Sequence, residues 1–405
     1  MPTSRLPLSR RATFWSASVV LALCLWASAA ASVLYPSYEA KWQLPSVVVT
    51  SVFGTYPVAL LLVLLFFGGV SDFIGRRRTM LIGVALITVS AVVFALAPNV
   101  GWLFVARVLQ GFGTGFAIGA ASARLVENNI SKNPRFPSSM TAVSTATGLT
   151  LALLLSGLLA QLAPLPLVLS FVVLFLLAVG AFVFVALTPD DRPQNEGEKW
   201  RPQALHLATG TVRPFIVATL SVSVAYSVGA LFLSLGSSMA RQLTHTSNLL
   251  VIGATLALSS LVIGVTALLI QRIHAHLAIV LGGAISIGGL AVMALTAASG
   301  SLILLLIWAL VGGVGYSLAF TGGLALLGRS TPSEHRGATL SLLYLFSYLL
   351  QAATAIGAGA LATAMGLGQA IGFVAPIVGL ICLAAIVLAA VDFVGRRGRV
   401  AALAV

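Results

Sequence analysis

Charged residues are scarce in this chain, and their scarcity excludes a water-soluble fold. Only 8% of its 405 residues are charged, 59% are hydrophobic, and the mean hydropathy is +1.07. Soluble domains carry about 25% charged residues, so this chain cannot expose enough charge to stay in water. Its apolar residues form long runs rather than a strict alternation, which excludes a β-barrel and predicts an all-α membrane protein.

Cysteine is also rare, and so are the motifs of enzymes. Cys24 and Cys382 each lie within an apolar run and have no metal-ligand spacing, so we expect them to pack as small apolar side chains. The sequence contains no G-x-x-x-x-G-K-[ST] phosphate loop, which argues against nucleotide hydrolysis. It offers no nucleophile with a matching base, so an enzyme is the least supported class, and we expect neither a metal nor a cofactor.

What the sequence has instead is twelve apolar runs long enough to cross a membrane. A helix of about 20 apolar residues spans the roughly 30 Å hydrocarbon layer with its backbone hydrogen bonds satisfied. We predict helices near residues 12–34, 46–70, 79–98, 102–125, 138–161, 164–188, 214–238, 249–270, 277–296, 302–327, 338–363 and 370–393. The first run is too long for the apolar part of a signal peptide and is expected to remain as the first span.

The longest polar stretch, residues 189–213, holds four of the nine acidic residues and separates two groups of six runs. We predict an N-terminal six-helix bundle at 1–188, a cytoplasmic linker at 189–213 and a C-terminal six-helix bundle at 214–405. A shift of 202 residues aligns the halves, because Asp72 then falls on His274 and Gly113 on Gly315. Two parallel six-helix halves with a ligand site at their interface are an established transporter layout.

Basic residues outnumber acidic ones by 22 to 9, but their positions indicate topology rather than nucleic-acid binding. If the N-terminus is cytoplasmic, 19 of the 22 lie on the cytoplasmic side, Lys41 and Arg241 lie opposite, and Arg107 lies within a helix. The positive-inside rule thus predicts two cytoplasmic termini in the inner or plasma membrane, with basic residues facing anionic lipid. No nucleic-acid partner is expected.

One short loop between the second and third predicted helices carries a dense motif. Its residues are Gly68, Ser71, Asp72, Gly75, Arg76, Arg77 and Arg78. The tight turn requires Gly75, because glycine accepts positive φ without strain, and Asp72 can pair with the arginines or lie at a helix N-terminus. Such pairs can hold one conformation and release in another. The alternative is an ordinary positive-inside loop, which explains only the arginines.

This loop resembles the motif of the major facilitator superfamily, G-x-L-[GAS]-D-[RK]-x-G-R-[RK]-[RK], from which Phe73 departs. In the fourth predicted helix, Arg107, Gln110 and Gly111 are similar to the superfamily pattern R-x-x-Q-G-x-G. A charge within a span costs at least about 2.5–3.5 kcal/mol, so Arg107 is expected to face a cavity or a partner. The resemblance implies a place in the substrate or proton pathway. The alternative is a side chain that snorkels to the outer surface.

A third motif is incomplete. The superfamily's drug antiporters carry G-x-x-x-G-P-x-x-G in helix 5, but between Gly148 and Gly157 this chain has Ala152 and Leu153 in place of Gly-Pro. The surviving glycines are expected to serve packing. This departure weakens the case for antiport and therefore for export.

Ionisable groups are missing from the predicted spans. All five histidines fall in loops, Glu39 falls just outside the first span and Asp392 at the end of the last. A cavity whose single charge is Arg107 favours neutral or anionic compounds. Other candidate lining residues, each of which can instead serve packing or the membrane interface, are Trp26, Tyr56, Tyr226, Trp308, Tyr316, Tyr344 and Gln351.

As a whole the chain resembles the superfamily's twelve-helix drug:proton antiporters. The resemblance implies a secondary active transporter that moves a small lipophilic compound by alternating access, uses the proton gradient and functions as a monomer. A proton symporter or importer of a small metabolite on the same fold is the alternative. A non-transporting membrane receptor is less favoured, because the transport motifs are present.

Overall fold

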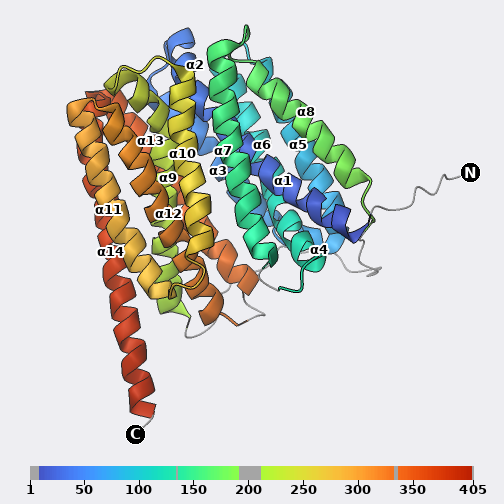
Figure 1. Cartoon of the computed structure of the whole chain (residues 1–405), viewed down its shortest axis with the longest axis vertical. Helices are drawn as coiled ribbons and strands as arrows, with labels where there is room; N and C mark the ends of the chain where they lie inside the picture. Colours follow the sequence, from blue (N-terminus) through green and yellow to red (C-terminus); the bar gives the residue numbers. More distant parts are fainter. Residues whose placement is uncertain (1–8, 134–135, 191–210, 333–335, 404–405) are drawn as a thin grey trace, which may run out of the picture. The chain divides into compact units, whose positions relative to one another are not determined.

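The described elements of the computed structural model are all helices, as the composition predicts (Figure 1). The structure describes residues 9–133, 136–190, 211–332 and 336–403. Within these ranges, twelve helices are long and apolar enough to cross a membrane. The predicted all-α fold with twelve spans is therefore confirmed.

The helices lie close to the predicted runs. The first half contains α1 (Arg10–Ala30), the 3-10 turn η1 (Ser32–Leu34), α2 (Tyr35–Trp42), α3 (Ser46–Phe67), α4 (Val70–Ile74), α5 (Arg76–Ala95), α6 (Val100–Glu127), α7 (Phe136–Leu162) and α8 (Leu169–Ala186). The second half contains α9 (Val212–Leu243), α10 (Leu249–Leu269), α11 (Ala275–Ser299), α12 (Leu302–Ser330), α13 (Arg336–Met365) and α14 (Leu367–Leu403).

The positions of two ionisable residues show where the predicted helix boundaries are wrong. The first run does not end near Leu34, because α2 continues it to Trp42, so Glu39 lies within a helix and inside the candidate span. His276, predicted in a loop, is the second residue of α11. The statement that no histidine lies within a span is therefore wrong. Polar residues at helix ends lower the local hydropathy before the backbone leaves the helix, so hydropathy ends a span too early.

The chain forms two compact units. Unit 1 comprises Met1–Ala31 and Val58–Gln203, and unit 2 comprises Ser32–Pro57 and Ala204–Val405. Unit 2 therefore includes η1, α2 and the first half of α3, which the sequence assigns to the N-terminal bundle. Residues 191–210 of the predicted linker lie outside the described residues. The predicted bundle bounds stay a prediction.

Unit 1 contains close approaches between helix backbones. α5 packs along α6 and against α8, and α1 packs on α6 and α7. A Cβ on Gly83 would lie 2.5 Å from the Gly113 carbonyl oxygen, and a Cβ on Gly148 would collide with the backbone of Ala22. Small residues permit such approaches. Gly148 therefore has the packing role expected of it.

Unit 2 repeats this arrangement. α11 packs along α12 and α14, and α14 continues past the first residues of α11 toward the C-terminus (Figure 1). A Cβ on Gly315 would lie 2.6 Å from Ser286 Oγ. Gly113 approaches Gly83 and Ile87 in the same way, and a shift of 202 residues maps positions 83–87 onto 285–289. Corresponding helices thus approach through glycine in both units, which supports the predicted repeat.

Candidate functional site

The switch loop, residues 68–78, turns at Gly75. This residue has φ +93° and ψ 145°, it separates α4 from α5, and it accepts a hydrogen bond from Thr79 Oγ1 at 2.9 Å. The positive φ predicted for Gly75 is confirmed. Gly68 follows the end of α3, where a Cβ would lie 2.6 Å from the Leu64 carbonyl oxygen. Glycine is therefore required on both sides of α4.

Arg76 joins the switch loop to α6. Its Nη2 lies 3.0 Å from Asp72 Oδ1, and its Nε donates to Glu127 Oε1 at 2.6 Å. Its Nη1 also donates to Ser71 Oγ at 3.4 Å. Of the two roles predicted for Asp72, the structure shows both, because it pairs with Arg76 and also lies in the first turn of α4. The Asp72 and Glu127 side chains are 63% and 49% exposed, and exposed pairs are worth only about 0.2–1 kcal/mol each, so this network can break at small cost.

Glu127 is absent from the predicted site residues, although it is the last residue of α6. Its signal in the sequence is an acid at the end of the same helix that carries Arg107. A second basic residue of α6, Arg124, was counted only as a topology signal, yet it is 2% exposed. Which loop residue each of them meets depends on helix packing, which the sequence pattern does not give.

Arg77 binds the C-terminal end of α8, and Arg124 binds the segment just after it. Arg77 donates from Nε to Val185 O at 3.3 Å and from Nη2 to Ala186 O. Arg124 donates from Nη2 to Pro189 O at 2.9 Å. Cations are favourable at a helix C-terminus, where carbonyl groups lack intrahelical partners. Of the three arginines of the loop, Arg76 joins the acidic network, Arg77 caps α8, and Arg78 is half-buried in the first turn of α5.

Arg107 lies inside unit 1 with no exposed surface. Its Nη1 donates to Ser28 O of α1 at 2.9 Å and to Gln110 Oε1 at 3.0 Å, and its guanidinium carbon lies 5.6 Å from the centre of the Phe94 ring. The expectation that Arg107 and Gln110 share a helix face is confirmed. A snorkelling side chain would reach the surface, so the structure does not support that alternative.

Small and aromatic residues surround this part of α6. Gly111 and Gly115 are buried, and a Cβ on Gly115 would lie 2.7 Å from Val63 Cβ of α3. Trp26 lies on α1 and is 8% exposed; among the described residues its Nε1 has no hydrogen-bond partner. Glycine thus keeps α6 close to its neighbours, and Trp26 leaves a donor that a ligand or water can use.

An aromatic cluster occupies unit 2. Its members are Tyr226 of α9, Tyr316 and Phe320 of α12, and Tyr344 and Tyr348 of α13. The Tyr226 ring centre lies 4.8 Å from Tyr348 and 5.8 Å from Phe320, and Tyr344 lies 6.0 Å from Tyr348. Phe320 and Tyr348 were not predicted, although each follows a predicted tyrosine by four residues and therefore shares its helix face.

Polar groups border the aromatic cluster where α9 faces α13. Ser223 Oγ donates to Ser347 Oγ at 3.2 Å, and Thr354 Oγ1 donates to Ser227 Oγ at 3.1 Å. Gln351 lies on the same helix as Ser347 and Thr354, and among the described residues its Oε1 is buried without a hydrogen-bond partner. The cluster therefore has an apolar face and adjacent polar atoms that can orient a ligand.

The remaining predicted residues differ in burial and are divided between the two units. Trp308 is 1% exposed and packs edge-on against Phe232 at 4.6 Å, which favours a packing role. Tyr56 lies in the first half of α3 and is half-buried. Arg107, Gln110, Gly111 and Trp26 belong to unit 1, whereas Tyr56, Trp308, Gln351 and the aromatic cluster belong to unit 2.

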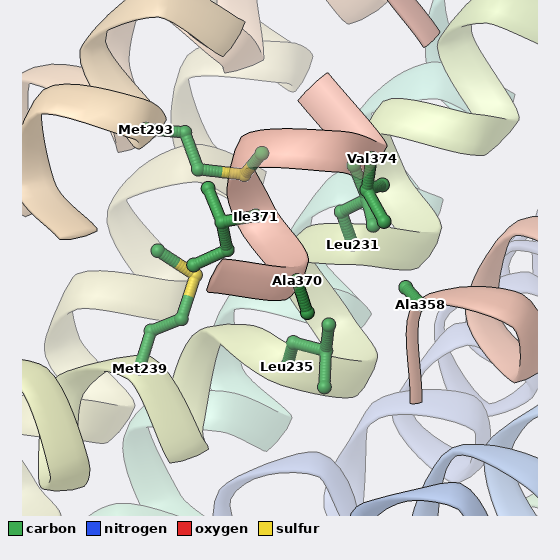
Figure 2. Close-up of a pocket in the computed structure, with 8 residues that line it drawn as sticks. All are labelled: Leu231, Leu235, Met239, Met293, Ala358, Ala370, Ile371 and Val374. Atoms are coloured by element: carbon green, nitrogen blue, oxygen red, sulfur yellow. The ribbon is translucent and has the colours of Figure 1, made fainter. Parts of the chain in front are cut away.

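One small cavity lies within unit 2, and the residues that line it are all apolar. Figure 2 shows Met239, Met293 and Ile371 around it, together with residues of α9, α13 and α14. Its volume of about 10 Å³ is at the lower limit for a single water molecule. Because its lining side chains are apolar and it has no room for a small organic molecule, this cavity is a packing gap rather than a substrate site.

A buried polar contact joins α11 to α14. His276 Nε2 lies 2.8 Å from Asp392 Oδ2, and both side chains are 8% exposed. Rings of His274 and Phe393 lie 5.6 Å and 5.5 Å from the His276 ring. Asp392 was placed only at the end of the last span in the sequence, and this pairing was not predicted because its partner is 116 residues away.

Comparisons with known proteins give short sequence matches and a full-length match in fold. The MFS-type transporter EfpA of Mycobacterium tuberculosis, described as uncharacterised, is 36% identical over 96 residues, or 23% of this chain and 18% of that protein. A lincomycin resistance protein of Streptomyces lincolnensis is 38% identical over 96 residues, covering 24% and 20%. The chain spans about a fifth of the length of these curated relatives.

Solved transporter structures match almost the whole chain. The nucleoside transporter NupG aligns with a TM-score of 0.72 and 12% identity over 93% of this chain and 99% of its own. A POT family transporter in complex with 5-aminolevulinic acid aligns with a TM-score of 0.75 and 12% identity, covering 95% and 96%. These likenesses show the fold. The family model of the Major Facilitator Superfamily matches residues 15–303, and the chain therefore belongs to this superfamily of transporters.

Proposed function

We propose that the chain exports a small lipophilic compound, neutral or anionic, in exchange for protons and by alternating access. The observation that carries the proposal is the fully buried Arg107, held by Ser28 O and Gln110 within a membrane-spanning helix. A guanidinium presents a planar fork of donors that suits a carboxylate or carbonyl group of a substrate. A buried cation also disfavours organic cations by direct repulsion.

The aromatic cluster supports a lipophilic substrate. Tyr226, Tyr316, Tyr344 and Tyr348 present rings on which a flat apolar molecule can stack, and Gln351 adds a nearby amide. Ligand sites are commonly apolar and aromatic, with few polar groups that fix orientation. This combination fits a small drug-like compound better than a highly hydroxylated metabolite.

The direction of transport and the orientation in the membrane are proposals that go beyond membership of the superfamily. The name of the lincomycin resistance protein is compatible with export of a drug-like compound. The chain is a multi-pass membrane protein; we place it in the cell membrane as a monomer, with both termini cytoplasmic and its basic loops against anionic lipid. The proton gradient is the proposed energy source, with no cofactor and no nucleic-acid partner.

Import is the second candidate direction. The D-xylose-proton symporter-like 3 protein of Arabidopsis thaliana is 39% identical over 59 residues, or 15% of this chain. In addition, Ala152 and Leu153, which replace the Gly-Pro pair of drug antiporters, are fully buried in α7. Both observations favour proton symport of a small metabolite over antiport.

Transport in proteoliposomes separates the two directions. Purified protein is reconstituted and given a panel of radiolabelled lipophilic compounds, neutral, anionic and cationic, with lincomycin included. Antiport predicts that an acidic lumen drives accumulation of neutral or anionic compounds and that a protonophore abolishes it. Accumulation driven by an acidic exterior would instead establish symport, and a preference for cations would contradict the role of Arg107.

A further inference from the structure

A carboxylate is held within unit 2 near the predicted extracellular end of the first span. Glu39 lies on α2, and Ser238 Oγ of α9 donates to both of its carboxylate oxygens at 3.2 Å. Glu39 is half-buried, and Ser238 is 1% exposed. Hydrogen bonds to an ionised carboxylate are roughly twice as strong as neutral ones. The ionised form of Glu39 therefore fastens α2 to α9.

Arg241 adds positive charge to the same contact. It lies three residues after Ser238, its Nη1 donates to Pro36 O of α2 at 2.9 Å, and its charge acts on the Glu39 carboxylate. The other charged or titratable groups at these helix ends are Lys41, whose Nζ lies 5.2 Å from the Trp42 ring, and the exposed His245 after α9, besides the phenols of α2. Arg241 is thus the cation that favours the ionised carboxylate.

Buried hydroxyl groups continue inward from Glu39 along α9. Ser238 and Ser234 are four residues apart, and Ser227 and Ser223 lie on the same helix face. Within the described part of the chain, Ser234 Oγ is buried and has no hydrogen-bond partner. Such groups are uncommon and usually mark a place for water or a ligand. The row ends beside the aromatic cluster, where Ser223 and Ser227 meet hydroxyls of α13.

We propose that Glu39 binds the coupling proton and that its protonation releases α2 from α9. The inference rests on the proposed proton exchange and names the residue that performs it. A proton from the predicted extracellular water binds a carboxylate oxygen; the hydrogen bond from Ser238 loses its charge assistance, and Arg241 loses its anionic neighbour. An ionisable group within a membrane span is costly and is therefore expected to have such a role.

Neutral variants at the contact test the assignment in proteoliposomes. Glu39→Gln resembles the protonated side chain, so we expect it to lose transport driven by a pH gradient while it still exchanges labelled for unlabelled substrate at equilibrium. Ser238→Ala keeps the carboxylate but removes its hydrogen-bond donor, so we expect the response to the gradient to weaken without being lost. Lys41→Gln removes an exposed charge from the same helix and is the matched control, expected to behave as wild type. A Glu39→Gln protein with wild-type response to the gradient would overturn the proposal.

A cysteine at position 234 gives a readout that needs no substrate. Among the described residues Ser234 Oγ makes no hydrogen bond, so Ser234→Cys removes none, and Cys24 and Cys382, both buried, are first replaced by alanine. A cysteine reacts as its thiolate, so its rate falls as the pH falls, and each rate is therefore divided by that of the exposed Gln242→Cys at the same pH. With Glu39 present, this ratio for a water-soluble thiol reagent should rise several-fold as the pH is lowered from mildly alkaline to mildly acidic. With Glu39→Gln the ratio should be high at both pH values. Equal, pH-independent ratios in both backgrounds would refute the role of Glu39, whereas a pH-dependent ratio without gradient-driven transport would refute only proton exchange.

Discussion

At the residue scale, Arg107 offers the sharpest separation between a functional and a structural role. We expect Arg107→Ala to lower transport by at least about tenfold, equivalent to about 1.4 kcal/mol, because it leaves Gln110 and Ser28 O without their buried donor. Arg107→Lys should rescue part of the activity, since lysine keeps the charge but loses the planar fork. Initial transport rates at matched protein levels give the order of activity of the wild type, the lysine variant and the alanine variant.

The control for the role of Arg107 measures whether substrate protects a cysteine at this position, rather than transport activity. A cysteine at position 107 should be shielded from a small thiol reagent by saturating substrate if the side chain lines the pathway. Full activity of Arg107→Lys together with an unprotected cysteine would assign Arg107 to packing, and the proposed preference for neutral or anionic compounds would lose its charged support.

The conformations and contacts of single residues were predictable where they depend on residues close in sequence. Gly75 has the positive φ that its motif requires, Asp72 pairs with Arg76 four residues later, and Arg107 meets Gln110 three residues later. Glu127 was not predictable, because its contact with Arg76 spans 51 residues of sequence and depends on how α5 packs on α6. The contact between Glu39 and Ser238 spans 199 residues and was missed for the same reason.

At the scale of elements, the switch loop and α6 act through one shared arginine. We expect Asp72→Asn and Glu127→Gln each to slow transport while lowering stability by less than about 1 kcal/mol, because the pairs are exposed. The double variant should be no slower than the worse single variant, since both acids act through Arg76. Transport rates and melting temperatures in detergent measure the two effects. Additive losses, or a wild-type rate in either single variant, would contradict a shared switch.

The observed helices agree with the predicted ones in their central residues but less well at their ends. Apolar runs gave the membrane-spanning helices because every backbone group in lipid requires an internal partner. The break of the first run into α1, η1 and α2 was not predicted, although Pro36 at the start of α2 is a signal for a new helix. That missed element carries Glu39, so a boundary error became a missed ionisable group.

At the scale of the whole molecule, hydropathy predicts which segments cross the membrane but not which segments pack together. The segment Ser32–Pro57 belongs to unit 2 although its neighbours on both sides in sequence belong to unit 1. Thr363 Oγ1 accepts from Val47 N at 2.9 Å, and a Cβ on Gly54 would lie 3.1 Å from Ile356 Cδ1 of α13. These contacts involve apolar side chains and one hydroxyl that look ordinary in sequence, so no pattern indicates the partner.

The orientation in the membrane is the property of the whole molecule that the positive-inside rule predicts and that labelling can check. In a background without Cys24 and Cys382, we expect an impermeant thiol reagent added to intact cells to label Ala40→Cys and Gln242→Cys, which replace exposed residues beside Lys41 and Arg241. Phe73→Cys replaces a side chain in the switch loop that is 40% exposed, so it should react only after the cells are permeabilised. Because all three sites are exposed, burial cannot explain a failure of Phe73→Cys to react in intact cells. Labelling of Phe73→Cys in intact cells would reverse the topology, and it would also place Glu39 on the cytoplasmic side. The coupling proton, which the gradient drives inward, would then not bind Glu39 from the extracellular water, and this result would contradict the proposed entry of the proton at the contact between α2 and α9.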